Sequence, residues 1–279
     1  MNAVAGKLCS LRRASSPSDV QILCSFDHAI SKYCNREGKK MCTTQCVFDD
    51  IMRVMNMKQF NKVQFLRSKC AGIDQTAFMK NKSLATDLEL YWKMMHETIA
   101  KLGVNAAQVA ELISIANIEL KDGFSEFARK TEQAAIPLII FSTGISNVIG
   151  TLLLQNIGAI PTNVHIVGNE FFVDKMGCFY GVRTPLIHRY NKSYALLSSR
   201  SSLVDSSNSA KTFVLIGNSL ENVSAAGRMR DKIALRIGFL NHDVDALKHT
   251  YMEKYDVVVT DPFSFAVPNK LLLSLLENC

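Results

Sequence analysis

The chain has 279 residues, a formal net charge of +7 and a hydrophobic fraction of 48%. This apolar content excludes disorder for most of the chain and is enough for one large α/β domain, with or without a smaller insert. We find no apolar run of about 18 residues free of charges, which excludes an evident transmembrane helix, and no basic stripe interleaved with aromatic residues that would indicate nucleic-acid binding. The positive charge is compatible with anionic ligands such as nucleotides.

The N-terminal segment and the cysteines bear on localisation. Residues 2–18 contain three basic residues and no acid, so residues 1–18 are either a flexible terminus or a weak mitochondrial presequence. The eight cysteines follow no disulfide pattern, and without a signal peptide they indicate reduced thiols in the cytoplasm. Cys42 and Cys46 lie near Cys34 but lack the second ligand pair that a zinc site needs, so we expect unpaired thiols on a helix.

The first predicted strand is the apolar run from Val20 to Phe26, and Asp27 follows at its mouth. Residues 35–127 then change to helical periodicity, with Asn105 as the expected N-cap of one helix. The predicted helices cover residues 48–55, 86–102, 106–120 and 124–131. This stretch is therefore predicted to be a helical insert.

The second half of the chain alternates strands with helices. The predicted strands cover residues 136–144, 164–169, 170–174, 178–181, 211–216, 234–237 and 257–260, with helices at 145–156 and from Tyr190 onward. This alternation predicts an α/β fold with a doubly wound parallel sheet, built from residues 19–34 and 128–279, and residues 35–127 as an inserted helical cap. In such a sheet the strand ends converge on one crevice, where ligands bind.

The polar residues at these strand ends occur in a specific order along the chain. The stretches that carry this order are Ser25-Phe-Asp-His-Ala-Ile-Ser-Lys-Tyr, Ile140-Phe-Ser-Thr-Gly-Ile, Leu186-Ile-His-Arg-Tyr-Asn-Lys, Val214-Leu-Ile-Gly-Asn-Ser, and Ile237-Gly-Phe-Leu-Asn-His-Asp-Val-Asp through Tyr251-Met-Glu-Lys-Tyr-Asp. The order resembles that of the haloacid-dehalogenase superfamily of phosphotransferases. In detail it is similar to the cytosolic type III pyrimidine 5′-nucleotidases, from about residue 20 to the C-terminus.

The resemblance implies a haloacid-dehalogenase-like fold and hydrolysis of nucleoside monophosphates through an aspartyl-phosphate. In the family, one aspartate attacks the phosphate and a second, two residues later, is the general acid and base. Mg²⁺ is held by the first aspartate, the carbonyl of the second and an aspartate of a later loop, since a carboxylate is both a hard ligand and a nucleophile. The acid/base position falls on Asp27, and the phosphate-binding positions fall on Ser142, Thr143 and Lys192.

The sequence departs from the family pattern at the catalytic positions. Ser25 stands where the family has the nucleophilic aspartate. Asn218 and Asn222 stand at the metal-binding positions of the later loop, with Glu221 beside Asn222. Asparagine is a neutral and poor substitute ligand for a hard divalent cation, so Mg²⁺ is expected to bind weakly or not at all. Loss of a nucleophile alone can lower kcat by a factor on the order of 10⁶.

One predicted helix resembles the family's base-binding helix. Tyr91, Trp92 and His96 match its aromatic-aromatic-x-x-x-His pattern, which implies a substrate-binding role. The family glutamate falls on Leu90, and Glu89 is one residue out of register, a rotation of about 100° around a helix. The alternative is that the two aromatic side chains only pack in the core of the cap.

Two functions follow from these observations. The first is a family member that is catalytically inactive or strongly impaired, keeps a crevice for a nucleoside monophosphate or phosphate, and acts by binding its ligand or a protein partner. In it, Lys192, Ser142 and the helix N-terminus after Gly144 would hold phosphate without metal. The second is an active 5′-nucleotidase for UMP, CMP or 7-methyl-GMP, with Ser25 as nucleophile and Asp27 as the candidate base. The plainer alternatives are that Ser142 is a turn residue and Lys192 a surface charge.

Overall fold

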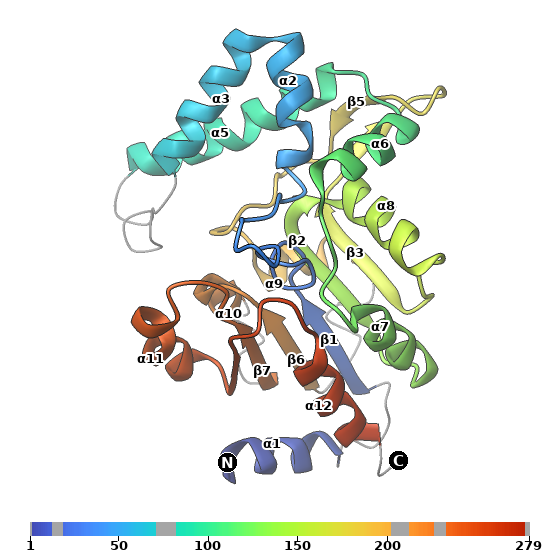
Figure 1. The fold of residues 1–279 in the computed structure, drawn as a ribbon, viewed down its shortest axis with the longest axis vertical. Helices are drawn as coiled ribbons and strands as arrows, with labels where there is room; N and C mark the ends of the chain where they lie inside the picture. Colours follow the sequence, from blue (N-terminus) through green and yellow to red (C-terminus); the bar gives the residue numbers. More distant parts are fainter. Residues whose placement is uncertain (1, 13–18, 71–81, 202–211, 226–232, 277–279) are drawn as a thin grey trace.

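A six-stranded parallel sheet forms the centre of the molecule, in the order β3-β2-β1-β6-β7-β8 (Figure 1). The computed structural model describes residues 2–12, 19–70, 82–201, 212–225 and 233–276. The strands are β1 (Val20–Cys24), β2 (Leu138–Ile145), β3 (Val164–Asn169), β6 (Thr212–Gly217), β7 (Ile233–Phe239) and β8 (Val257–Val259). The chain adds strands first on one side of β1 and then on the other, so the predicted doubly wound α/β fold is confirmed. The ends of β1 and β6 meet where the winding direction reverses, which is where ligands bind in such sheets.

Both faces of the sheet are buried, which explains the continuous apolar runs in its strands. All five residues of β1 are buried. Ile22 and Cys24 belong to the main core, whereas Leu23 packs on the opposite face in a second cluster with Phe141 and Leu215. Successive side chains of a strand point to opposite faces, so a strand covered on both sides must be apolar at every position.

Helices surround the sheet along most of its length. They are α7 (Phe124–Gln133), α8 (Ser146–Ile157), α9 (Tyr194–Ser198), α10 (Leu220–Ala225), α11 (Val244–Lys254) and α12 (Ala266–Leu276). The helix predicted from Tyr190 begins only at Tyr194, where Ser193 is the N-cap and accepts a hydrogen bond from the Leu196 amide. The predicted strand at 211–216 starts at Lys211, which lies outside the described residues. Among the described helices, none has both the length and the apolar character needed to cross a membrane.

A second group of elements lies beyond the carboxyl ends of the central strands, at the top of Figure 1. It contains η2 (Cys46–Phe48), α2 (Asp49–Met55), α3 (Met57–Cys70), α5 (Lys82–Lys101) and α6 (Ala106–Ala116), and the hairpin β4 (Phe171–Val173) and β5 (Phe179–Val182) packs against α5. We call these elements the upper group. Asn105 forms a capping box with Gln108 at the start of α6, as predicted.

The N-terminus differs from the expected flexible segment. Asn2–Arg12 form helix α1, which packs against β7 and α12. Leu11 is buried, and Lys7 Nζ lies 2.7 Å from a carboxylate oxygen of Asp256. These tertiary contacts explain the helix, because nothing in the local pattern of this short segment required one. Residues 13–18, the rest of the expected flexible segment, lie outside the described residues.

Candidate functional site

The predicted site residues of the sheet meet around one cavity of about 320 Å³. Ser25 and Asp27 follow β1, Ser142 and Thr143 lie near the end of β2, Asn218 lies in the loop after β6, and Asn222 lies in α10. Lys192 reaches the same cavity from the loop before α9. We call this the phosphate crevice, and the predicted residues that line it are Ser25, Asp27, Ser142, Thr143, Lys192, Asn218 and Asn222.

A triangle of hydrogen bonds occupies the base of the phosphate crevice. Ser25 Oγ donates to Asn222 Oδ1 at 2.8 Å, and Lys192 Nζ donates to Ser25 Oγ and to Asn222 Oδ1, each at 3.0 Å. Lys192 is only 8% exposed, so the alternative that it is a surface charge is wrong. Burial lowers the pKa of Lys192 to about 8, because desolvation disfavours the ammonium. The lysine is thus a buried cation hydrogen-bonded to neutral oxygens.

The loop that carries Lys192 is fixed to the sheet by Asn169, the last residue of β3. The side-chain Nδ2 of Asn169 donates to the Thr143 carbonyl at 2.8 Å and to the Ile187 carbonyl at 2.9 Å. Its side-chain oxygen Oδ1 accepts from the backbone N–H of Ile187 at 2.7 Å. Asn191 closes the same loop by bonding to Leu186 O and His188 N. A fully buried asparagine therefore ties the ends of two strands to the lysine loop.

Asp27 is held by Thr44, a residue that no sequence motif singled out. The Thr44 amide donates to Asp27 Oδ1 at 2.8 Å and its hydroxyl donates to Oδ2 at 2.9 Å. Burial raises the pKa of Asp27 to about 6, although the two Thr44 bonds act in the opposite direction. Gly144 packs directly on this pair, since a Cβ there would lie 2.2 Å from Thr44 Oγ1 and 2.7 Å from Asp27 Oδ2.

The geometry changes the assignment of a base for Ser25. We expected Asp27 to be the candidate, but both of its oxygens accept bonds from Thr44. The group bonded to the Ser25 hydroxyl oxygen is Lys192 instead. Ser142 Oγ accepts from the Gly144 amide at 2.9 Å, so this hydroxyl takes part in the strand-to-helix turn while it also lines the cavity.

Two tyrosines of α11 position the loop after β6. Tyr251 Oη donates to the Asn218 carbonyl at 2.9 Å, and Tyr255 Oη donates to the Ser219 carbonyl at 2.5 Å. The Asn218 side-chain oxygen lies 3.5 Å from Asn222 Nδ2. The backbone of the predicted metal-binding loop is therefore held by two hydrogen bonds, and the side chain of Asn218 bonds to that of Asn222 in α10 as one amide to another.

The donor set of the phosphate crevice does not fit Mg²⁺. This ion prefers several carboxylate oxygens and water in octahedral geometry. Among the described residues that line the crevice, the carboxylates are Asp27 and Glu221, and Asp27 is already bonded to Thr44. A buried ammonium, Lys192, contacts both Ser25 and Asn222. We find no group of three or more His, Cys, Asp or Glu residues suited to a metal within the described part of the chain.

Of the predicted base-binding residues, which all lie on helix α5, two line a cavity described here and two do not. Tyr91 and Trp92 are buried in the core and also line a second cavity, so both of their predicted roles are compatible with the structure. His96 is 0% exposed and stacks between Trp92 and Phe171, away from the two cavities described here. Glu89 is exposed on α5 and lines neither of these cavities.

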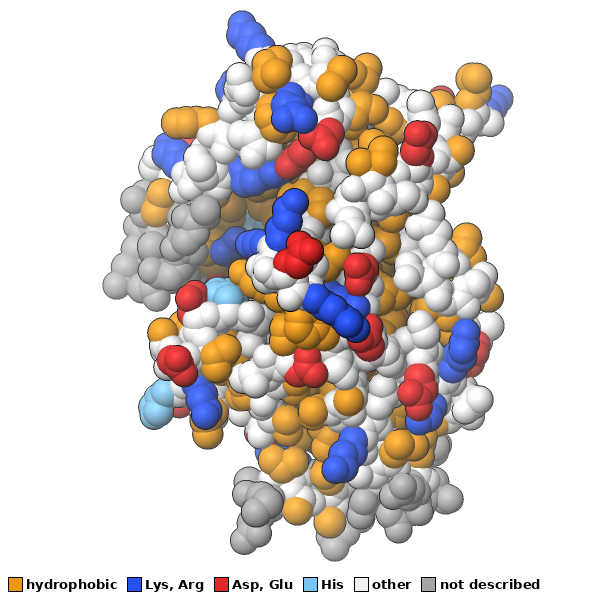
Figure 2. All heavy atoms as spheres, viewed as in Figure 1, with side chains coloured by type: hydrophobic (Ala, Val, Ile, Leu, Met, Phe, Trp, Pro, Cys, Tyr) orange, Lys and Arg blue, Asp and Glu red, His pale blue; other side chains and the backbone are white. Residues whose placement is uncertain are grey.

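The second cavity, of about 790 Å³, lies between the upper group and the sheet, and we call it the upper cavity. Among the described residues that line it, four carry cationic side chains and none carries a carboxylate; the four are Lys39, Lys40, Arg67 and Arg189. Figure 2 shows basic side chains around a hollow in this part of the surface. Arg67 forms two hydrogen bonds to the Asp49 carboxylate, at 2.6 and 2.9 Å. The upper cavity shares Thr43, Gln45, Trp92 and Arg189 with the phosphate crevice, so one ligand can extend through both.

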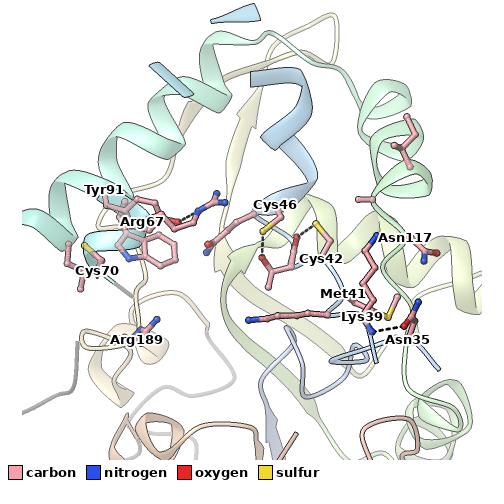
Figure 3. Close-up of a pocket in the computed structure, with 17 residues that line it drawn as sticks. Asn35, Lys39, Met41, Cys42, Cys46, Arg67, Cys70, Tyr91, Asn117 and Arg189 are labelled. Carbon is pink, nitrogen blue, oxygen red and sulfur yellow. Dashed lines mark hydrogen bonds between the residues drawn. The ribbon is translucent and has the colours of Figure 1, made fainter. Parts of the chain in front are cut away.

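The structure corrects the prediction that Cys42 and Cys46 lie on a helix. Cys42 lies in a segment without regular structure and Cys46 begins the 3-10 helix, so the two are not on an α-helix. Both side chains reach the upper cavity (Figure 3). Sequence reasoning also missed Arg189, whose only signal was its position three residues before Lys192 within a motif.

Comparison with known proteins finds similarity to 5′-nucleotidases. The model of the pyrimidine 5′-nucleotidase (UMPH-1) family matches residues 28–276. A Caenorhabditis elegans relative is 28% identical over 274 residues, covering 97% of this chain and 72% of the relative. The 7-methylguanosine phosphate-specific 5′-nucleotidase of Gallus gallus is 26% identical over 264 residues, covering 93% of this chain and 89% of that protein.

Solved structures show the same fold. The crystal structure of cytosolic 5′-nucleotidase IIIB bound to cytidine has a TM-score of 0.82 and 22% identity, covering 99% of this chain and 91% of the other. A probable phosphoserine phosphatase from Vibrio cholerae has a TM-score of 0.55 and 11% identity, covering 94% of this chain and 67% of the other. Together with the family match over most of its length, these likenesses establish that the chain belongs to the pyrimidine 5′-nucleotidase family.

Proposed function

We propose that this family member binds a nucleoside monophosphate or inorganic phosphate in the phosphate crevice, without a metal ion, and does not hydrolyse it at the rate of its catalytic relatives. We propose further that residues 35–127 act as its cap and that it works in the cytoplasm. The observation that carries the proposal is the Ser25–Lys192–Asn222 triangle. It places a lysine between an alcohol and an amide, where the family mechanism needs two carboxylates and an ion.

The charge balance of the phosphate crevice supports anion binding. Lys192 bonds to neutral oxygens, so its charge is not paired by a carboxylate at hydrogen-bond distance. A buried cation of this kind is costly, and an incoming phosphate oxygen would offset that cost. Arg189 adds a second positive charge to the lining. Ionised Asp27 repels a phosphate anion, whereas protonated Asp27 does not. Because the pKa of Asp27 is about 6, this side chain is often protonated in mildly acidic solution.

The upper cavity is the proposed place for the nucleoside. Tyr91 and Trp92 offer aromatic faces for a base, and Trp92 also lines the phosphate crevice. Among the described lining residues no carboxylate faces the cations Lys39, Lys40 and Arg189, so the cavity favours a neutral base over a cationic one. We therefore propose UMP or CMP as better ligands than 7-methyl-GMP, whose methylated base carries a positive charge.

One contact supports a second candidate, an active hydrolase that uses Ser25 as nucleophile. The Ser25 oxygen lies 3.0 Å from Lys192 Nζ, and the pKa of Lys192 is lowered to about 8 by burial. A neutral lysine at that place can accept the serine proton. The hydrogen bonds oppose this role, because Ser25 donates its proton to Asn222 while Lys192 donates to Ser25.

A phosphate-release assay separates the two candidates. Purified protein is incubated with UMP, CMP and 7-methyl-GMP in the presence of Mg²⁺, alongside a catalytic relative. We expect no release above the blank from protein that is folded and that binds UMP by calorimetry. Turnover comparable to that of the relative would overturn the proposal. Slow turnover that is lost in Ser25→Ala and insensitive to EDTA would instead favour the serine-lysine hydrolase.

A further inference from the structure

Two cysteine side chains meet on the wall of the upper cavity. The thiols of Cys42 and Cys46 are neighbours in the cavity wall, and each bonds to Thr43. Thr43 lies between them, with its hydroxyl 3.2 Å from Cys46 Sγ and its carbonyl oxygen 3.3 Å from Cys42 Sγ. Both cysteines are partly exposed and line the cavity, as Figure 3 shows, so a small solute can reach them.

The two thiols differ in reactivity. Interaction with the neighbouring Cys42 thiol, together with the Thr43 hydroxyl and the charge of Arg67, lowers the pKa of Cys46 to about 6 although burial opposes the shift. The same contact and burial raise the pKa of Cys42 well above its usual range. Near neutral pH the pair therefore holds one thiolate, which is the nucleophilic form, next to one thiol.

The segment between the cysteines holds the phosphate crevice together. Thr44 donates both of the hydrogen bonds that fix Asp27. The Thr44 hydroxyl also accepts from the Ile145 amide at 3.2 Å, and Gln45 donates to the Thr143 carbonyl at 3.2 Å. A covalent change between residues 42 and 46 must therefore move groups that contact Asp27 and the end of β2.

We propose that Cys46 and Cys42 form a peroxide-reactive thiol pair, with Cys46 as the attacking and Cys42 as the resolving residue. The Cys46 thiolate attacks one oxygen of hydrogen peroxide, so that an S–O bond forms and the O–O bond breaks. The departing hydroxide takes a proton and leaves as water. The Cys42 sulfur then attacks the sulfenic sulfur, an S–S bond forms, and the S–O oxygen leaves as a second water with the proton of Cys42. Two thiols are oxidised by two electrons and the peroxide is reduced to two waters.

The disulfide brings the two sulfurs to about 2.05 Å, closer than any hydrogen-bonded contact, and therefore draws the 43–45 segment inward. Thr44 then moves relative to Asp27, and the phosphate crevice loses its present shape. The thiol chemistry stands independently of any nucleotide, whereas the effect on binding rests on the proposed function. The two are measured separately in the experiment below.

The disulfide is measured by mass on the full-length folded protein. Residues 41–53 form a single tryptic peptide that contains both cysteines. After treatment with hydrogen peroxide and blocking of free thiols, we expect this peptide to be two hydrogen masses lighter and unblocked, with dithiothreitol reversing the change. Cys42→Ser should instead accumulate a sulfenic acid at Cys46 that dimedone traps, and Cys46→Ser should react at least about 10-fold more slowly, because its thiolate is gone. Cys178→Ser, which changes another partly exposed free cysteine, should behave as wild type.

The proposal is overturned if the 41–53 peptide stays reduced while other cysteines of the chain oxidise, or if Cys42→Ser reacts to the same disulfide-linked products as wild type. The second readout is UMP affinity by calorimetry before and after oxidation, where we expect a loss of at least about 10-fold that dithiothreitol reverses. A disulfide that forms without changing UMP affinity would refute the link to Asp27 while leaving the thiol pair in place. Absence of UMP binding by the reduced protein would count against the proposed function and not against the thiol pair.

Discussion

The phosphate crevice and the upper cavity share a wall but differ in how their polar groups are paired. In the phosphate crevice, Ser25, Asn222 and Lys192 bond to one another, and Asp27 bonds to Thr44. In the upper cavity the cations Lys39, Lys40 and Arg189 line an open space, and no described residue of the lining carries a carboxylate. The polar groups of the phosphate crevice are thus hydrogen-bonded to protein groups, whereas the upper cavity has cations that face open space.

This difference indicates which parts of the fold would persist through the proposed loss of catalytic residues. The hydrogen bonds that position the loops come from Asn169, Asn191, Tyr251 and Tyr255, and none of them depends on a metal. Ser25 and Asn222 stand where the family resemblance implies aspartates, and the contacts that position the loops are present beside them. A phosphate-binding site can persist in such a scaffold, because the strand ends still converge.

The largest expected effect comes from restoring the carboxylates. The triple variant Ser25→Asp, Asn218→Asp and Asn222→Asp places acids on both sides of Lys192, where wild type has neutral oxygens. We expect Mg²⁺-dependent release of phosphate from UMP at least about 10³-fold above wild type, since loss of a nucleophile alone costs more than that. Adding Asp27→Asn to the triple variant is the control and should remove the gain. A folded triple variant with no activity would show that the upper cavity has also diverged.

Neutralising the buried lysine should have the next largest effect. Lys192→Met removes the ammonium but leaves the Ser25–Asn222 bond in place. We expect UMP affinity to fall by about 10- to 100-fold, the range of one lost charge-assisted hydrogen bond, with no loss of stability. Lys175→Met, on the exposed hairpin turn, is the matched control and should bind as wild type. Equal affinity in the two variants would place the phosphate elsewhere.

The contact between Asp27 and Thr44 can be tested through Gly144. In Gly144→Ala the new Cβ would lie 2.2 Å from Thr44 Oγ1 and 2.7 Å from Asp27 Oδ2. We expect a loss of about 1–3 kcal/mol in the free energy of unfolding, the usual cost of overpacking. Gly150→Ala in α8 meets only an ordinary contact at 3.9 Å and should be neutral or stabilising by up to about 1 kcal/mol. Similar stability of the two variants would contradict the tight packing at the end of β2.

The smallest expected effect is a pH dependence of stability. Burial raises the pKa of Asp27 from 3.8 to about 6, so the fold favours the protonated acid. The stability that this preference contributes is present below about pH 4 and is lost as the pH rises through 6. The unfolding free energy of Asp27→Asn minus that of wild type should therefore increase by about 1–2 kcal/mol from pH 4 to pH 7.5, after allowance for solvent screening. The variant becomes relatively more stable because it has no carboxyl group to ionise. Urea denaturation at several pH values measures it, and a constant difference would contradict the raised pKa.

The sequence was informative where local pattern and motif order decide the outcome. The apolar run from Val20 predicted β1, and Asn105 predicted the start of α6, because strand burial and helix capping are local. The convergence of Ser25 and Lys192 followed from parallel topology and the motifs. Helix α1 could not be predicted, since it depends on contacts of Leu11 and Lys7 with distant elements.

Contacts between segments without regular secondary structure also could not be predicted from the sequence. Thr44 lies in a stretch with no periodicity, and only the three-dimensional path of the chain brings it to Asp27. The meeting of Cys42 and Cys46 has the same origin, because their spacing fits an α-helix that the chain does not form. The one-residue shift of Glu89 was visible in the sequence, but its exposure depended on how α5 packs against the hairpin.

We propose that the phosphate crevice holds a nucleotide phosphate through Lys192 without a metal ion. Calorimetric titration of the full-length protein with UMP, once in EDTA and once in Mg²⁺, tests it most directly. We predict binding in EDTA with a Kd within about 2-fold of the value in Mg²⁺, since the donor set does not fit the ion. Binding that appears only when Mg²⁺ is present would contradict the account.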